Sequence, residues 1–168
     1  MVTAVDLEFT EVKVAPALAV QMSGKCPPDP AAIGPAVRSA FESLMSFVHR
    51  RALAPNGPPR TIYTAHGRDG VSFIVAMPVA AGPVKPFDEP HLKVETLPGM
   101  KAYRFTHHGP YAGLGSTYEH ITEFMIQKRW MKSQADWNRY MPMWEEYLNN
   151  PETTPAAELK TYIYLPAA

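Results

Sequence analysis

The sequence predicts an α+β fold in which one βαββ unit occurs twice along the chain. Three observations support this: alternating valine-rich stretches, two segments with apolar residues at helical spacing, and the same order of elements in both halves. We expect a single domain over residues 1–168, with halves at about 5–79 and 91–166 and a proline-rich connector at 80–90. Together the halves are expected to form one antiparallel, about eight-stranded sheet with two main helices on one face and a central ligand cleft.

Each half is expected to open with a bent strand and to close with two further strands. Residues 7–22 alternate around a bend at Pro16, and residues 92–108 contain a bend at Pro98-Gly99. The first closing pair reads as a β-hairpin, and the second is joined by a longer loop. The closing strands are expected at residues 61–66, 70–77, 141–148 and 159–165.

One amphipathic helix is expected in each half, because apolar residues recur at steps of four, three and four. The repeating residues are Val37, Phe41, Leu44 and Val48 in the first half, and Leu114, Tyr118, Ile121 and Met125 in the second. The helices are expected near residues 37–51 and 116–129. Asp29-Pro30 predicts a cap for the first helix, with Gly34-Pro35 as a second possible start. Ser116 with Glu119 predicts a capping box for the second.

Composition narrows the function classes. Lysine plus arginine equals aspartate plus glutamate at 16 each, the pI is near 7.0, and no basic run suggests nucleic-acid binding. Charged residues near the start argue against an ordinary signal peptide, and no apolar stretch approaches the ~18 residues of a membrane span. We therefore expect a soluble, cytoplasmic protein. With Cys26 as the only cysteine, an internal disulfide and a cysteine metal cluster are both ruled out.

Glu145 is the residue that most needs an explanation. It stands among aromatic residues in an expected strand, and an unpaired buried carboxylate is costly unless something cationic or reactive meets it. The alternative is a solvated strand residue beside Glu146. Trp144 has the opposite strand parity, so if Glu145 faces a pocket, Trp144 is expected to pack under a helix.

Aromatic residues concentrate around this segment. Trp130, Trp137 and Trp144 lie within fifteen residues of one another, whereas the first half has no tryptophan. Flat rings beside a carboxylate suit a planar cation, with ~0.5–2 kcal/mol for each favourable ring contact. The alternative for any single ring is ordinary packing, and parity alone does not decide which rings line the cleft. The candidate ligand-binding residues are Glu145, Tyr147, Tyr103, Phe105, Tyr63, Phe73, Tyr111, Trp137, Tyr140 and Tyr162.

Several motifs, in their order and spacing, resemble the GyrI-like small-molecule-binding domain, which is also the effector-binding domain of AraC- and MerR-type multidrug regulators. These motifs are Leu53 to Pro59 followed by Tyr63, Pro98-Gly99, His108-Gly109-Pro110-Tyr111, Glu145 to Pro151, and Leu159 to Pro166. The resemblance covers almost the whole chain and implies the duplicated βαββ fold. The family's pocket carries a glutamate two residues before a tyrosine, a pattern that falls on Glu145 and Tyr147. Side chains two apart on a strand share a face, as one ligand contacting both requires.

The resemblance implies three roles for a free-standing copy of the domain. Because the domain fills the chain, we expect no helix-turn-helix and no direct DNA binding. The favoured role is binding or sequestration of lipophilic, often cationic or planar aromatic small molecules. The alternatives are hydrolysis, as in relatives that open cyclopropane-bearing DNA-alkylating natural products, and action on a protein partner, as in gyrase inhibition.

For hydrolysis, Glu145 would be the general base, and Tyr147 or Tyr103 would donate a proton to the developing oxyanion. Neither role needs a metal or another cofactor, and none is expected. The adjacent His107 and His108 point to opposite faces of a strand and cannot chelate one ion together. No histidine is singled out as a haem ligand.

Overall fold

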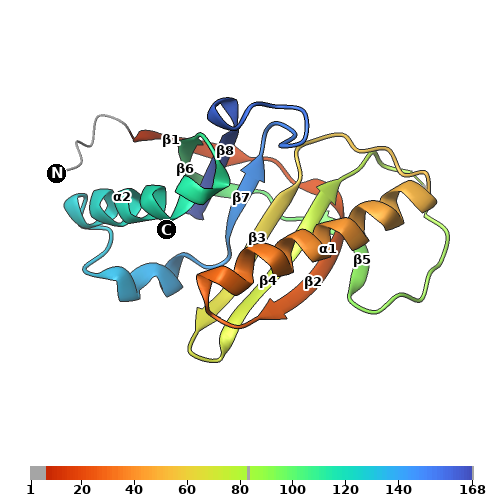
Figure 1. Cartoon of the computed structure of the whole chain (residues 1–168), viewed down its shortest axis with the longest axis horizontal. Helices are drawn as coiled ribbons and strands as arrows, with labels where there is room; N and C mark the ends of the chain where they lie inside the picture. The colour runs from red at the N-terminus through yellow and green to blue at the C-terminus, as the bar shows by residue number, and fades with distance from the viewer. Residues whose placement is uncertain (1–6, 83, 168) are drawn as a thin grey trace.

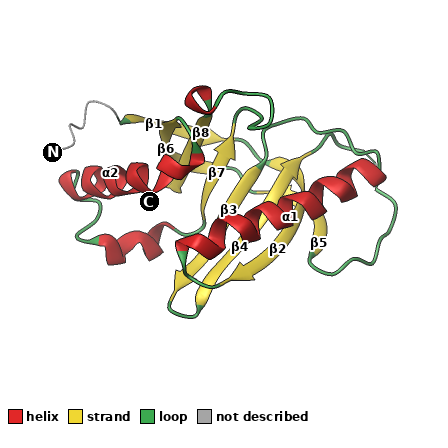
Figure 2. Ribbon diagram, in the orientation of Figure 1, coloured by secondary structure: helices red, strands yellow, loops and turns green. Residues whose placement is uncertain are grey.

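The computed structural model describes residues 7–82 and 84–167, in which eight strands form one antiparallel sheet (Figures 1 and 2). The strands are β1 (Glu8–Val14), β2 (Ala17–Cys26), β3 (Arg60–Gly67), β4 (Gly70–Pro78), β5 (Leu92–Leu97), β6 (Met100–His108), β7 (Met143–Tyr147) and β8 (Lys160–Pro166). The helices are α1 (Pro30–Arg50) and α2 (Leu114–Gln127), with short 3₁₀ helices η2 (Tyr111–Gly113), η3 (Gln134–Tyr140) and η4 (Ala156–Glu158). The predicted fold class is confirmed: both main helices cover the same face of the sheet.

The sheet has the order β1-β6-β8-β7-β3-β4-β2-β5. This order maps onto itself when β1–β4 are exchanged with β5–β8, so the halves are related by a pseudo-twofold axis between β3 and β7. Each expected opening strand is in fact two strands, and the first part of each pairs with the other half, β1 with β6 and β5 with β2. The bends that divide them pack together, since a Cβ added at Gly99 would lie 2.7 Å from Cδ of Pro16. The bends thus exchange the edge strands between the halves.

The two helices begin differently. The Asp29 side chain accepts a hydrogen bond from the Ala31 amide at 3.0 Å, which confirms the predicted cap of α1, and Gly34-Pro35 lies inside the helix. The expected capping box of α2 is wrong. Helix α2 starts at Leu114 with no side-chain cap, because η2 leads directly into it and places Ser116 inside the first turn.

Three apolar clusters stabilise the sheet. One lies beneath α1 and one beneath α2, and each helix contributes a buried stripe as its periodicity predicts. The third cluster lies on the helix-free face, where Trp144 stacks on Tyr164 with ring centroids 4.8 Å apart. The expectation that Trp144 packs under a helix is therefore wrong, because the opposite face of the sheet has an aromatic core of its own. Within residues 7–82 and 84–167, neither main helix is long and apolar enough to cross a membrane.

Candidate functional site

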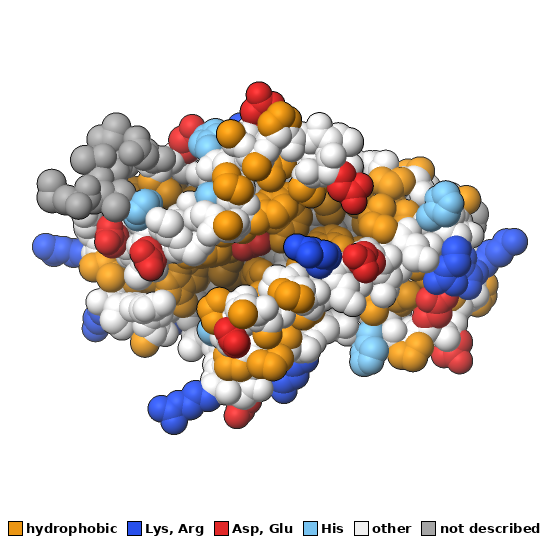
Figure 3. Space-filling model, viewed as in Figure 1, with side chains coloured by type: hydrophobic (Ala, Val, Ile, Leu, Met, Phe, Trp, Pro, Cys, Tyr) orange, Lys and Arg blue, Asp and Glu red, His pale blue; other side chains and the backbone are white. Residues whose placement is uncertain are grey.

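The site lies where the two halves meet. Glu145 on β7 pairs with Thr61 on β3 and with Ile163 on β8, and its side chain is only 4% exposed. In Figure 3 the helix-bearing face is hollowed between α1 and α2, hydrophobic side chains line the hollow, and an acidic side chain is visible within it. The buried carboxylate is thus at the centre of the sheet, on the face between the two helices.

Two tyrosine hydroxyls hold the Glu145 carboxylate. Tyr118 on α2 donates to Oε2, and Tyr147 on β7 donates to Oε1 at 2.7 Å. The hydroxyl of Thr61 lies 2.7 Å from that of Tyr147, and since Tyr147 donates to Glu145, Thr61 donates to Tyr147. Burial and then the charge of Glu145 raise the pKa of both tyrosines, so both remain protonated donors at neutral pH.

Within the described part of the chain, Glu145 forms no ion pair. Burial raises the pKa of Glu145, while the hydrogen bonds from Tyr118 and Tyr147 and the charge of the nearby His107 act in the opposite direction. Among residues 7–82 and 84–167, no lysine, arginine or histidine forms an ion pair with this carboxylate. The neighbouring Glu146, on the other face, does have such a partner: Arg60, at 3.4 Å. Two adjacent buried carboxylates therefore differ: among the described residues Glu146 forms an ion pair and Glu145 does not.

Aromatic rings from both halves surround the tyrosines. The ring of Tyr147 has Phe41 of α1 at 6.0 Å and Tyr111 of η2 at 5.5 Å, both in edge-on arrangements. Trp137 of η3 lies 5.8 Å from the ring of Tyr118. These rings offer apolar and π surfaces close to the carboxylate.

Of the sequence-predicted residues, the structure brings four others to Glu145. Tyr147 and Tyr111 are described above, and Trp137 reaches the site through Tyr118. Tyr63 lies close enough that Glu145, after burial, contributes to raising its pKa.

The remaining predicted residues lie elsewhere. Tyr103, Phe105 and Tyr140 belong to the core beneath α2, where Tyr103 stacks on Trp130 at 4.5 Å, and Phe73 belongs to the core beneath α1. Tyr103 is thus not placed to act as the alternative hydroxyl donor beside Glu145.

The structure contradicts the prediction that Tyr162 lines the ligand site. It pairs with Glu146 on the helix-free face, with the guanidinium of Arg104 4.1 Å from its ring centroid. The parity of β8 therefore prevents Tyr162 from sharing a ligand with Glu145.

Sequence reasoning did not identify Tyr118, Thr61 and Phe41 as parts of the site. Tyr118 was visible only as one member of the apolar stripe of its helix. A phenolic hydroxyl on a buried stripe needs a hydrogen-bond partner, and this requirement is the signal that points toward Glu145. Thr61 and Phe41 come from the first half, and only the pairing of β3 with β7 brings them near.

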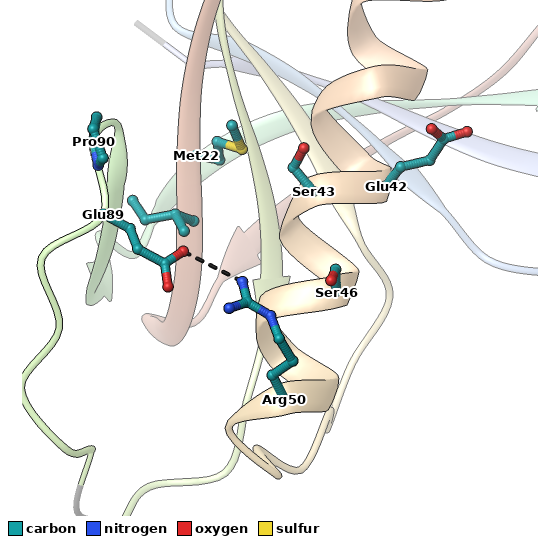
Figure 4. Close-up of a pocket in the computed structure, with 8 residues that line it drawn as sticks. Met22, Glu42, Ser43, Ser46, Arg50, Glu89 and Pro90 are labelled. Atoms are coloured by element: carbon teal, nitrogen blue, oxygen red, sulfur yellow. Dashed lines mark hydrogen bonds and ion pairs between the residues drawn. The ribbon is translucent and has the colours of Figure 1, made fainter.

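A separate groove of about 490 Å³ lies on the outer side of α1, between it, β2 and the start of β5 (Figure 4). Its lining residues are Met22, Glu42, Ser43, Ser46, Arg50, Glu89, Pro90 and Leu92. An exposed ion pair between Arg50 and Glu89, 3.5 Å apart, crosses it. Exposed ion pairs of this kind contribute little to the stability of a protein. The groove contains none of the residues around Glu145. Among the described residues there is also no group of three or more histidine, cysteine or acidic side chains able to hold a metal ion.

The chain matches the family model of the GyrI-like small molecule binding domain over residues 7–168, and it belongs to this family. No curated protein matches the sequence. Among solved structures, an EcmrR–DNA complex is similar with 15% identity and a TM-score of 0.71 over 95% of this chain, which spans 57% of that chain's length.

Two further solved structures have the same fold. SAV2435 bound to tetraphenylphosphonium is 14% identical with a TM-score of 0.61, over 96% of this chain and 94% of that one. A hydrolase from Listeria innocua is 15% identical with a TM-score of 0.57, over 96% and 92%. At these identities the likeness concerns the fold alone.

Proposed function

We propose that this domain binds lipophilic cations, planar aromatic ones among them, with Glu145 as the charge partner and the surrounding rings as the apolar walls. The observation that carries the proposal is a buried carboxylate held by two tyrosines, with no ion-pair partner among the described residues. A bound cation would offset the unfavourable desolvation of that charge.

The shape of the site supports the same ligand class. Phe41, Tyr111 and Tyr147 present ring edges and faces next to the carboxylate, and the hollow between the helices is lined by hydrophobic side chains (Figure 3). Such rings favour a delocalised cation over a small hydrated one. The neighbour SAV2435, bound to tetraphenylphosphonium, shares the fold and is consistent with this proposal.

A pair of probes with one shape and opposite charge tests the proposal. We expect tetraphenylphosphonium to bind at micromolar strength, about −8 kcal/mol, and tetraphenylborate much more weakly. Glu145→Gln should weaken phosphonium binding about 10- to 100-fold, because the cation loses its buried charge partner. Isothermal titration or displacement of a rhodamine dye gives both affinities.

Glu146→Gln is the matched control. It removes the adjacent carboxylate, which lies on the opposite face beside Arg60, and should leave phosphonium affinity within about twofold. Equal phosphonium affinity for wild type and Glu145→Gln would show that the Glu145 carboxylate does not contribute to ligand binding. Tight binding of both tetraphenyl ions would show that charge does not select the ligand.

Hydrolysis is the second candidate, because the Glu145 carboxylate and the Tyr147 hydroxyl lie side by side, 2.7 Å apart, and these are groups able to act as a general base and a hydrogen-bond donor. Binding and hydrolysis share these residues, so turnover distinguishes them. Incubation of catalytic amounts of protein with an electrophilic cyclopropane-bearing compound, followed by mass spectrometry, settles the matter for that compound. More than one equivalent of product per protein, lost in Glu145→Gln, supports a hydrolase; one equivalent or less supports a binder.

A further inference from the structure

We infer that His107 is the positioning residue of the Glu145 site: its two ring nitrogens fix the segment 110–118, which carries two of the tyrosines around the carboxylate. The ligand part of this inference rests on the proposed function; the geometric part does not.

His107 lies on β6 and is 5% exposed. It pairs with Thr161 on β8, which pairs with Tyr147 on β7, so all three belong to one row on the helix side of the sheet. The imidazole thus lies on the same face as Glu145, two strands away.

Both ring nitrogens have partners in the segment that leads into α2. Nε2 lies 2.9 Å from the carbonyl oxygen of Pro110, and Nδ1 lies 2.6 Å from the hydroxyl of Thr117. A carbonyl can only accept, so Nε2 carries a proton and donates it, while the hydroxyl of Thr117 pairs with Nδ1 in either role. One buried side chain therefore holds two points seven residues apart.

Each point adjoins a tyrosine of the site. Pro110 directly precedes Tyr111, whose ring contacts that of Tyr147, and Thr117 directly precedes Tyr118, whose hydroxyl donates to Glu145. Apart from the bond to Glu145 itself, these are the only side-chain hydrogen bonds between segment 110–118 and the sheet among the described residues. His107 therefore ties the chain directly before each tyrosine to the sheet.

The start of α2 has few other restraints. It has no side-chain cap, unlike α1, so the bond to Thr117 secures its first turn. The turn also packs directly on the imidazole, since a Cβ added at Gly113 would lie 3.2 Å from Cε1 of His107. Glycine at this position allows the close approach.

The first test reads the position of Tyr118 without any ligand. The hydrogen bond from Tyr118 lowers the pKa of Glu145, and so does the charge of His107, so displacing Tyr118 and removing the His107 charge should each raise it. Carboxyl-carbon NMR of labelled protein gives the titration midpoint of Glu145 in wild type, His107→Ala, Tyr118→Phe and the double variant. With His107→Gln measured alongside, we expect His107→Ala to raise the midpoint more than His107→Gln does, and this difference to vanish in the Tyr118→Phe background.

His107→Gln separates position from charge, because a glutamine amide can donate to the Pro110 carbonyl and cannot be protonated like imidazole. The midpoint change in His107→Gln therefore reports the lost charge, and the additional change in His107→Ala reports the lost position. Equal midpoints in His107→Gln and folded His107→Ala, or a difference between them that persists in the Tyr118→Phe background, would each overturn the inference. Should His107→Ala not fold, Thr117→Val removes one of the two bonds at nearly constant shape and should raise the midpoint by a smaller amount.

The second test measures ligand affinity. Loss of preorganised walls should weaken tetraphenylphosphonium binding about fivefold in His107→Ala, with His107→Gln close to wild type. In the Tyr118→Phe background the same histidine change should have a smaller effect. If no variant and not even wild type binds the phosphonium, the proposed function fails, whereas the NMR titration still decides the role of His107.

Discussion

The two halves of the sheet share one strand arrangement but use their helices differently. Helix α1 buries Ala40, Leu44, Phe47 and Val48 against β2 and β4, an interface made of apolar packing. Helix α2 buries Ile121 and Met125 and adds polar contacts: Tyr118 to Glu145, Thr117 to His107, and Thr122 to Trp137. The comparison indicates that α1 contributes apolar packing, whereas α2 adds polar contacts and the second half holds most of the polar groups of the site.

We expect the largest loss of stability from Phe47→Ala in the first half. The Phe47 side chain is fully buried and packs edge-on against Phe87 at 4.9 Å, so its loss should lower the free energy of unfolding by about 3–5 kcal/mol. Urea unfolding measures this. In the second half, Tyr118→Phe loses one hydrogen bond to a carboxylate and should lower it by about 1.5–3 kcal/mol.

We expect the two variants to rank in the opposite order when loss of ligand affinity, and not loss of stability, is measured. Phosphonium affinity of the protein that remains folded should be nearly unchanged in Phe47→Ala and reduced in Tyr118→Phe. An affinity loss in Phe47→Ala as large as that in Tyr118→Phe would show that the halves do not divide their roles.

The fold was largely predictable because its signals are local. Periodicity along α1 and α2 and the turn residues between β3 and β4 predict their own elements. The exchange of edge strands was not predictable, because it depends on how sharply the chain bends at Pro16 and Pro98-Gly99 and on the contact between these bends. No local sequence pattern specifies how sharply the chain bends at these positions.

The site was predictable to the same extent. Glu145 and Tyr147 share a strand face by their spacing, so sequence parity alone brings them together. Tyr118 and Thr61 reach the carboxylate only through the packing of a helix and the pairing of central strands. Strand parity also predicted that Trp144 lies on the other face of the sheet from Glu145. It could not predict that this face is covered by an aromatic cluster and not by a helix.

The stability of the wild type should depend on pH through Glu145, whereas a glutamine at this position does not titrate. Its pKa is raised above the ordinary 4.5 by burial, so the folded state binds a proton more tightly than the unfolded state. The stability this provides is fully present below about pH 4.5 and is lost as the pH rises through the folded-state pKa. At a pH above the folded-state pKa the charged form is present, and Glu145→Gln should then melt about 2–4 °C higher, the effect of about 1 kcal/mol on a domain of this size.

Thermal melts of both proteins from pH 4.5 to 8 check this prediction. The advantage of the glutamine variant should shrink toward the acidic end, where wild type becomes neutral at this position. A difference in melting temperature that stays constant over the whole range would mean that Glu145 has the same pKa in the folded and unfolded states.

The smallest expected effects concern the helix starts, which also differ between the halves. Asp29 caps α1, so Asp29→Ala should lower the free energy of unfolding by about 0.5–1 kcal/mol, and Asp29→Asn should retain most of it because asparagine caps equally well. Ser116 lies inside α2 and caps nothing, so Ser116→Ala should be neutral or stabilise by a few tenths of a kcal/mol, since alanine is the better helix former. Urea unfolding resolves the difference when the variants are measured side by side. A loss for Ser116→Ala as large as that for Asp29→Ala would place the start of α2 at the capping box in solution, and the first turn of α2 would then not depend on His107.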